Sequence, residues 1–412
     1  MRRLLCLAVW IVAAPAARAG SLDGRWDATV TIHENEIPFR IDFSGDGPSF
    51  TGTLFDGDLK VTSTGGQLEN GTLVVNFGHY LTRLTATPKD GELDGKVEGR
   101  FERDKYISSY PFHARRHKPS TVAAGAVPVI DGLWEIPYKS PKGEKAWRLI
   151  VRQNGPDVKA AILRVDGDTG TLSGTYKDGK WLLSHFSGSR PLVLEIKPSK
   201  EGTLEILPSG AYTAKLKLAA YRPADARAKG LPEPADFDNH TTLKKPDQPF
   251  QFSFPDLDGK ILSNNDPRFK GKVVVAVVTG TWCPNCHDEA QFLVQLDRKY
   301  RDRGLAIVAL DFEEPEQQED GLTRARAFIK KYGVQYTYLI AGSPVEMWEK
   351  VPQAVNLNSW PTTFFIGRDG RVKKIHAGFA SPASGAFHDQ VTEEFASTVE
   401  RLLAENDATA SR

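Results

Sequence analysis

The sequence predicts a multi-domain protein in which two tandem all-β domains, each a small barrel or sandwich, precede an α/β domain. Three observations support this prediction. Short alternating segments separated by Gly, Asp and Asn turns continue as far as Pro223, that region contains an internal repeat, and strands alternate with helices after residue 247. With 412 residues, 40% of them hydrophobic, the chain is long enough for two or three cores.

Charge composition limits the classes of partner. The chain has 53 basic and 52 acidic residues and a net charge of +1, which gives no electrostatic reason to expect nucleic acid or anionic lipid as a partner. No run of residues after the first twenty is long and apolar enough to predict a membrane-spanning helix. Function must therefore be inferred from local motifs.

The beginning of the chain has the pattern of a signal peptide, predicted over residues 1–19. Arg2-Arg3 is followed by an apolar stretch over residues 4–14 and by the small-residue cleavage site Ala17-Arg18-Ala19. We expect cleavage after Ala19 and export to the periplasm or cell envelope, or secretion. Cys6 is interpreted as an apolar residue of this segment, so removal of the segment would leave two of the three cysteines.

The two β-domains are predicted over residues 20–118 and 127–225. Phe39, Ile41 and Phe43 alternate with polar residues, as do Leu216 and Leu218 near the end of the second domain, and this period is typical of half-buried strands. A stretch of small residues around 121–127 joins the two domains. The domains resemble small calycin-like barrels.

The β-region is duplicated. Asp23-Gly24-Arg25-Trp26 recurs as Asp131-Gly132-Leu133-Trp134, an offset of 108 residues, and Asp56-Gly57-Asp58 recurs as Asp166-Gly167-Asp168 at an offset of 110. We interpret the tryptophans as core residues. The Asp-Gly-Asp runs lack the further carboxylates of a calcium loop, so we interpret them as turns.

A linker is predicted over residues 226–246, because the chain from about 223 to 249 is rich in Pro, Ala, Asp and Lys and has no periodicity. The α/β domain is predicted over residues 247–406. Its expected strands are 272–278, 305–310, 336–340, 363–366 and 372–375, and its expected helices follow the cysteine pair and cover 322–332 and 391–404.

The two remaining cysteines, Cys283 and Cys286, are separated by two residues and lie between a β-branched strand and an amphipathic helix. A ring this small contributes little loop-closure entropy, so structural stabilisation is a poor reason for the pair. A cysteine in the first turn of a helix faces unpaired backbone N–H groups and the positive end of the helix dipole, and both favour the thiolate. We therefore expect Cys283 to be the attacking sulfur and Cys286, one turn later, to be the resolving sulfur.

Residues 247–406 resemble the thioredoxin superfamily, and within it the TlpA/ResA-like (redoxin) branch of extracytoplasmic thiol-disulfide oxidoreductases. The resemblance rests on the run Gly280-Thr281-Trp282-Cys283-Pro284-Asn285-Cys286, the following His287-Asp288-Glu289, and Trp360-Pro361-Thr362-Thr363-Phe364. The separation of 75 positions from Cys286 to Pro361 leaves room for the extra strand and helix of this branch, expected within residues 311–334. The resemblance implies a thioredoxin-like fold and a protein-disulfide reductase that receives electrons from a membrane thiol donor.

The resemblance also implies supporting roles for residues around the cysteines. Pro361 is expected to be cis and to lie beside the pair, flanked by Trp360, which would narrow substrate choice, and by Thr362. Trp282 and Pro284 belong to the motif itself. Glu289 is expected to exchange protons with the buried thiol. Val277 stands where thioredoxin has a buried aspartate, which leaves Glu289 as the better candidate for a proton relay.

Three other functions stay open from the sequence. Cys283 to His287 also satisfies the C-x-x-C-H signature of c-type haem attachment. A peroxiredoxin-like peroxidase shares the same core, and a binding protein with an auxiliary redox domain is the third alternative. No cofactor and no metal are expected, since two thiols without a further His or Cys cluster do not complete a zinc site. The oligomeric state, the clients, and the direction of electron flow are not encoded in the motif.

Overall fold

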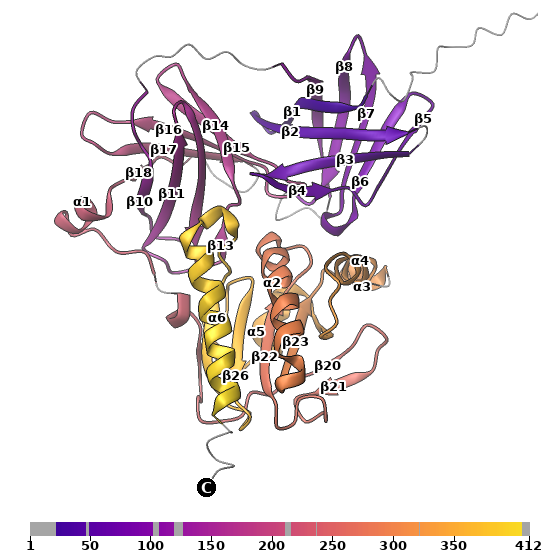
Figure 1. The fold of residues 1–412 in the computed structure, drawn as a ribbon, viewed down its shortest axis with the longest axis vertical. Coiled ribbons are helices and arrows are strands. Elements are labelled where there is room, and N and C mark those ends of the chain that lie inside the picture. Colours follow the sequence, from indigo (N-terminus) through magenta and orange to yellow (C-terminus); the bar gives the residue numbers. More distant parts are fainter. Residues whose placement is uncertain are drawn as a thin grey trace, which may run out of the picture.

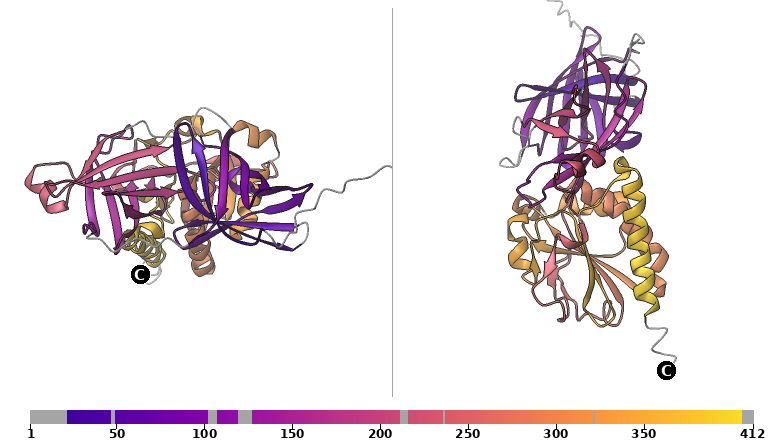
Figure 2. Two further views of the ribbon diagram at one scale, coloured as in Figure 1. Left: turned by 90° about the horizontal axis from the view of Figure 1, so that it is seen from above. Right: turned by 90° about the vertical axis from the view of Figure 1, so that its left-hand side faces the viewer.

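The computed structural model describes residues 22–46, 49–101, 107–118, 127–210, 216–235, 237–320 and 322–405. The predicted signal peptide with Cys6, and most of the small-residue stretch at 121–127, lie outside these residues. Among the residues described, no helix combines the length and the apolar character needed to cross a membrane. Figures 1 and 2 show two β-units side by side, with an α/β unit packed beneath both of them.

The first β-unit (residues 24–116) is a barrel-like antiparallel sheet. Strand β2 pairs with both β1 and β3, which closes the path β2-β1-β9-β8-β7-β6-β5-β3 on itself. Inward-facing side chains alternate with exposed ones, as expected of a closed sheet. Its elements are β1 Gly24–Ile32, β2 Asn35–Asp46, β3 Ser49–Asp56, β4 Leu59–Thr62, β5 Gly65–Glu69, β6 Thr72–Phe77, η2 Gly78–Tyr80, β7 Thr82–Lys89, β8 Glu92–Gly99 and β9 Ser108–Arg116.

The second β-unit (residues 132–221) repeats this design. Its strands follow the order β10-β11-β12-β14-β15-β16-β17-β18, and two backbone hydrogen bonds between Glu135 and Tyr221 join the two ends. Residues 211–215, which include part of a predicted strand, lie outside the described chain. The strands are β10 Gly132–Pro137, β11 Ala146–Asn154, β12 Asp157–Arg164, β13 Gly167–Asp168, β14 Leu172–Lys177, β15 Lys180–His185, β16 Leu192–Pro198, β17 Leu204–Gly210 and β18 Leu218–Ala220.

The duplicated Asp-Gly-x-Trp motif forms the same corner in both β-units. Trp26 is 2% exposed and Trp134 is 4% exposed, and each indole N–H donates to a backbone carbonyl four residues earlier, at 2.9 and 2.8 Å. A guanidinium covers each ring, Arg116 in the first β-unit and Arg222 in the second. Both tryptophans therefore belong to the cores of their barrels.

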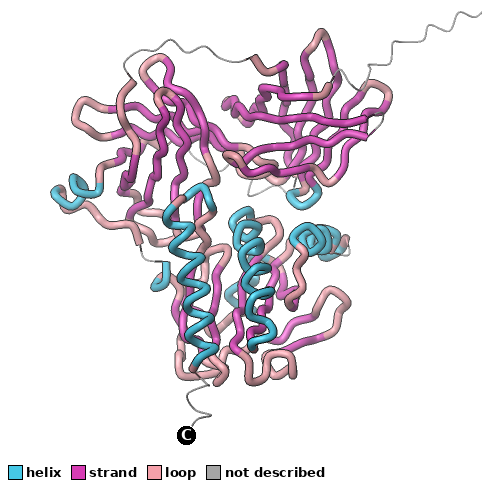
Figure 3. Tube along the Cα trace, in the orientation of Figure 1, coloured by secondary structure: helices cyan, strands magenta, loops and turns pink. Residues whose placement is uncertain are grey.

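The α/β unit contains a five-stranded sheet in the order β24-β23-β22-β26-β27. Strands β22, β23 and β24 are parallel, while β26 and β27 form an antiparallel hairpin. Helices α2, α4 and α6 pack on one face, and Figure 3 shows the main helices gathered in this part of the chain. The main elements are β22 Val273–Thr279, α2 Pro284–Tyr300, β23 Leu305–Phe312, α4 Thr323–Tyr332, β24 Thr337–Gly342, β26 Thr362–Ile366, β27 Val372–Ala377 and α6 Ala386–Ala404.

Short elements complete the structure, most of them in this unit and α1 against β10 of the second β-unit, and sequence periodicity did not predict most of them. They are too brief to show a period, and contacts from distant parts of the chain hold them. They comprise α1 Pro223–Ala228, η3 Phe237–Asn239, β19 Thr242–Leu243, β20 Ser253–Pro255, β21 Ile261–Ser263, η4 Arg301–Arg303, α3 Pro315–Glu319, η5 Pro344–Glu346, α5 Met347–Lys350, β25 Ala354–Val355 and η6 Pro382–Ser384.

The predicted linker over residues 226–246 differs from a free tether. Strand β19 pairs with β25, and the Asp238 carboxylate contacts His376 and Lys374 of β27. Because these contacts are made by isolated side chains, composition alone described the segment only as aperiodic. The segment is therefore docked on the α/β unit.

Side chains of the second β-unit are buried in the hydrophobic cores of the two other units, so the contacts between the units are not confined to their surfaces. Phe186 and Val193 of the second β-unit are buried in the core of the first, and Leu163 of β12 joins the core formed by α2, α4 and α6. Burial of such side chains stabilises each contact by ~2 kcal/mol. The placement of the β-units against the α/β unit is therefore part of the fold.

Replacement of a duplicated tryptophan should reduce stability. We expect Trp26→Phe to lower the free energy of unfolding by about 2 kcal/mol, because it removes a buried indole hydrogen bond and leaves a cavity. Trp348→Phe is the control, since Trp348 is 58% exposed and should change the value by less than ~0.5 kcal/mol. Denaturant unfolding measures both variants, and equal effects would contradict the assignment of Trp26 to the core.

Candidate functional site

The cysteine pair lies where the central strand passes into a helix. Strand β22 ends at Thr279, α2 begins at Pro284, and Cys283 is the N-cap residue of that helix. The backbone N–H of Cys286 donates to the Cys283 sulfur at 3.3 Å, which stabilises negative charge on that atom. Both thiols are free and buried, with Cys283 5% exposed and Cys286 1% exposed.

The cysteines face the loop that contains Pro361. The Trp360–Pro361 peptide bond is cis, as the resemblance implied, and the Cys283 thiol donates to the Trp360 carbonyl oxygen with a separation of 3.6 Å. The Thr362 hydroxyl donates to the carbonyl of Ser359 and fixes the same loop. The cysteine motif and the Trp360–Pro361 loop were predicted from sequence to form one site although Cys286 and Pro361 are 75 positions apart. They meet at the Cys283 sulfur.

Two tryptophans form a wall beside the pair. The rings of Trp282 and Trp360 meet edge to face with centroids 5.0 Å apart, and the Trp282 indole N–H donates to the carbonyl of Phe312 at 2.9 Å. Arg100 of the first β-unit lies over the Trp282 ring, 5.2 Å from its centroid, and pairs with Glu314 at 2.8 Å. The first β-unit therefore contributes a side chain to the site.

Burial makes the Cys286 thiol harder to ionise than the thiol of a free cysteine. Desolvation raises the pKa of Cys286 well above its usual value, and the adjacent Cys283 sulfur adds to the effect. Cys286 therefore needs a proton acceptor before it can attack a disulfide.

Glu289 is a carboxyl group with an altered proton affinity on the same helix. Its side chain is 1% exposed, and desolvation raises its pKa to about 8 even though the Thr363 hydroxyl donates to it. Tyr336 lies near both Glu289 and Cys286: burial raises the pKa of its phenol first, and charge on these two groups raises it further. Glu289 is therefore a buried group that can exchange a proton near neutral pH.

A buried ionic network holds Thr281, the residue before Trp282, and sequence motifs did not predict it. Glu313 accepts hydrogen bonds from the backbone N–H and the hydroxyl of Thr281, and Arg324 of α4 pairs with both Glu313 and Glu314. The side chains of Arg324 and Glu313 are fully buried. Because no single motif contains these residues, only the adjacent acidic pair at 313–314 within the predicted insert hinted at them.

His287 takes part in packing instead of facing an open site. Burial lowers the pKa of His287 well below its usual value, so the ring is neutral. One ring nitrogen lies 2.7 Å from the Thr281 carbonyl and the other 2.8 Å from the Tyr332 hydroxyl. The ring donates to the first and accepts from the second, which leaves no nitrogen for a haem iron and removes the support for the haem alternative.

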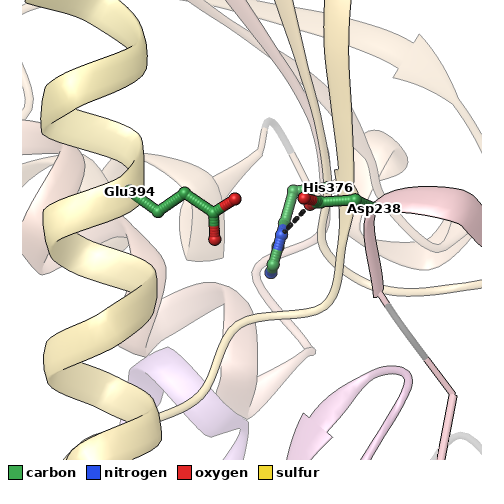
Figure 4. Close-up of side chains that lie close together, drawn as sticks. All are labelled: Asp238, His376 and Glu394. Carbon is green, nitrogen blue, oxygen red and sulfur yellow. Dashed lines mark hydrogen bonds and ion pairs between the residues drawn. The ribbon is translucent and has the colours of Figure 1, made fainter.

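A second cluster of polar side chains lies where η3, β27 and α6 meet. Figure 4 shows Asp238, His376 and Glu394 converging from η3, β27 and α6. The ammonium of Lys374 lies 2.9 Å from the Asp238 carboxylate and also pairs with Glu394, so a cation already balances the two acids. Although burial opposes it, hydrogen bonds from His376 and Lys374 lower the pKa of Asp238. The cluster fastens the segment after α1 to the α/β unit.

A pair of cysteines at the first turn of a helix, after a central strand and opposite a cis-proline, is the arrangement of the thioredoxin class. A model of the Redoxin family matches residues 245–389. The thioredoxin-like protein YneN of Bacillus subtilis is 32% identical over 127 residues, which cover 31% of this chain and 68% of that protein. Through its C-terminal part, the chain belongs to the redoxin family of the thioredoxin superfamily.

Other relatives carry the name thiol-disulfide oxidoreductase ResA. The Bacillus anthracis protein is 31% identical over 121 residues, which cover 29% of this chain and 62% of ResA. The chain thus spans about 62% of the length of the first ResA proteins it matches. Among solved structures, a putative thiol:disulfide interchange protein DsbE from Chlorobium tepidum aligns with 39% of this chain and 99% of its own, at 23% identity and a TM-score of 0.31.

Loss of the buried arginine should disturb the network behind the cysteines. We expect Arg324→Met to lower the free energy of unfolding by about 3 kcal/mol, because Glu313 and Glu314 would lose their buried partner. Arg326→Met is the control two residues further along α4, where the ion pair with Asp258 is exposed. Chemical denaturation compares the two, and similar losses would argue against a special role for Arg324.

The proton affinity of Glu289 predicts a pH-dependent effect on stability. Its folded pKa of about 8 lies above the ordinary glutamate pKa of 4.5, so the folded state retains the proton and wild-type stability falls as pH rises between these values. Glu289→Gln removes this dependence, and we expect the variant to gain about 4 kcal/mol relative to wild type between pH 4.5 and pH 8. Unfolding curves across this range provide the test, and a constant difference between the proteins would refute the raised pKa.

Proposed function

We propose that this protein is a thiol-disulfide oxidoreductase that reduces disulfides of protein clients outside the cytoplasm through Cys283 and Cys286. The single observation that carries the proposal is the position of Cys283 at the N-cap of α2, with a backbone N–H directed at its sulfur. Similarity to proteins named thiol-disulfide oxidoreductase ResA supports the reaction class. The predicted signal peptide supports the location.

The first step joins Cys283 to the client. The Cys283 thiolate attacks one sulfur of the client disulfide, forms a mixed disulfide with it, and releases the other sulfur as a thiolate that takes up a proton. The N-cap hydrogen bond from Cys286 and the positive end of α2 stabilise the attacking anion before this step. The Trp360 carbonyl, which accepts the Cys283 thiol hydrogen before this step, is the other polar contact of that sulfur.

The second step releases the reduced client. Cys286 loses its proton, attacks the Cys283 sulfur of the mixed disulfide, and displaces the client as a thiolate. Since burial raises the pKa of Cys286, we assign Glu289 as the proton acceptor that starts this step. Two electrons pass from the dithiol to the client, and an external thiol donor, expected to be a membrane protein, must reduce the Cys283–Cys286 disulfide again.

Trapping experiments test the roles of the two sulfurs. We expect Cys286→Ser to accumulate mixed disulfides with client proteins through Cys283, because the resolving step is lost. Cys283→Ser should accumulate none, because Cys286 is 1% exposed and lacks the N-cap position. Non-reducing gels and mass spectrometry of the linked peptides measure both outcomes.

The reverse result, with clients on Cys286 alone, would overturn the assignment of roles. Peroxide turnover that survives Cys286→Ser and exceeds disulfide reduction would instead favour a peroxidase. Wild-type protein is the matched control, since its resolving sulfur should keep the mixed disulfide from accumulating.

A further inference from the structure

The second β-unit contacts the residue between the two cysteines. The Asn285 side chain is 4% exposed, its amide N–H donates to the Asp166 carbonyl at 2.6 Å, and its oxygen accepts from the Arg190 guanidinium at 2.8 Å. Arg190 also donates to the backbone carbonyl of Asp168. In Figure 1 the upper end of α2 points toward the β-units. One face of the dithiol motif is therefore covered by this β-unit.

Two glycines allow the backbones to approach closely beside the site. Gly167 of β13 forms a parallel bridge with Phe379, and Gly378 donates its N–H to the carbonyl of Pro361 at 2.7 Å. A Cβ on Gly167 would lie 2.2 Å from the Phe379 carbonyl oxygen, and a Cβ on Gly378 would lie 2.3 Å from the Val165 carbonyl oxygen. The β-unit thus places an extended strand against the loop that adjoins the cis-proline.

A buried carboxylate fixes this contact. Asp168 is fully buried and accepts hydrogen bonds from the Ser381 N–H and hydroxyl and from the Ser384 hydroxyl, at 2.6 to 2.9 Å. Its fourth donor is the N–H of Gly170 within its own β-unit. The Asp166-Gly167-Asp168 run, interpreted from sequence as a turn, therefore serves as the clamp between the second β-unit and the α/β unit.

The first β-unit secures the other side of the site. Its η2 element packs on α4, with the Tyr80 ring 4.5 Å from the His287 ring, and Arg100 pairs with Glu314. The Asp56 carboxylate of the matching Asp-Gly-Asp run accepts from the Thr171 N–H at 2.7 Å, which joins the two β-units at this junction. Both Asp-Gly-Asp runs therefore help to hold the β-units over the dithiol motif.

We propose that the β-units form a client filter over the dithiol, with Gly167 and Asp168 as its specificity-determining residues. In the closed arrangement Cys283 is only 5% exposed. On this proposal, small thiols and disulfides reach its sulfur without any rearrangement of the β-units. The disulfide of a folded protein reaches Cys283 when β13 separates from the loop at residues 378–381. This inference rests on the proposed function, because it defines which substrates that dithiol accepts.

The test compares the rates at which two maleimides modify Cys283 in the reduced full-length protein. One reagent is N-ethylmaleimide and the other carries a bulky polymer, and mass spectrometry of the Cys283 peptide measures both rates. Wild type should react with the small reagent and discriminate strongly against the large one. Gly167→Ala places a methyl group against the Phe379 carbonyl, so we expect it to raise the rate for the large reagent about tenfold or more.

Gly179→Ala is the matched control. Gly179 has a φ of 81°, in the same left-handed region that Gly167 occupies, but a Cβ there would meet no atom within 4 Å. The variant has the same kind of backbone strain as Gly167→Ala, but its added methyl group contacts nothing. Its rates of modification by both maleimides should therefore equal those of wild type. Ser384→Ala is a gentler second variant that removes one hydrogen bond to Asp168, and it should raise the large-reagent rate by a smaller factor.

Two results would overturn the filter. One is equal reaction of wild-type Cys283 with both maleimides, a measurement that needs no variant to fold. The other is an unchanged large-reagent rate in a folded Gly167→Ala or Ser384→Ala protein, with circular dichroism as the check on folding. Alkylation by maleimide does not depend on catalytic turnover. If wild-type Cys283 discriminates between the two maleimides but Cys286→Ser traps no client, the filter is supported and only the proposed reductase function is refuted.

Discussion

The structure depends on the turn from β22 into α2, because that turn places one sulfur at a helix start and faces it toward the cis-proline loop. Thr281 within the turn is held by Glu313, and Glu313 is held by Arg324, so a buried ionic network from the insert fixes the residues just before Cys283. Buried pairs of this kind contribute little net stability but define geometry strongly. The position of Cys283 therefore depends on the buried charges of Glu313 and Arg324, which lie behind the dithiol and not on its surface.

Around this turn, burial gives the two sulfurs different chemistry. Cys283 receives a backbone hydrogen bond at the helix start, whereas desolvation raises the pKa of Cys286, and Glu289 is held in the same apolar surroundings with a pKa of about 8. The same burial also restricts access, since the second β-unit lies on Asn285 between the cysteines. Reactivity and accessibility at this site therefore arise from one packing arrangement.

Much of the α/β unit was predictable from sequence, because period and motif are local. The β-branched run became β22, the amphipathic spacing after Cys286 became α2, and the runs expected as strands at 363–366 and 372–375 became β26 and β27. Long-range side-chain partners were not predictable in this way. Asp168 was interpreted as a turn residue, but its carboxylate joins the second β-unit to the α/β unit. Residues 226–246 were predicted to be a linker, but Asp238 binds them to the α/β unit. Arg324 belongs to no sequence motif, although it holds the buried network.

On the proposed mechanism, Cys283 and Cys286 form one reversible redox couple. The decisive measurement is equilibration of the full-length protein with mixtures of reduced and oxidised glutathione, followed by mass spectrometry of the peptides that contain both cysteines. We expect a single two-electron transition between the dithiol and an intramolecular Cys283–Cys286 disulfide. Oxidation that instead left Cys286 as a free thiol, with sulfenic or sulfinic acid or a lasting glutathione adduct on Cys283, would contradict it.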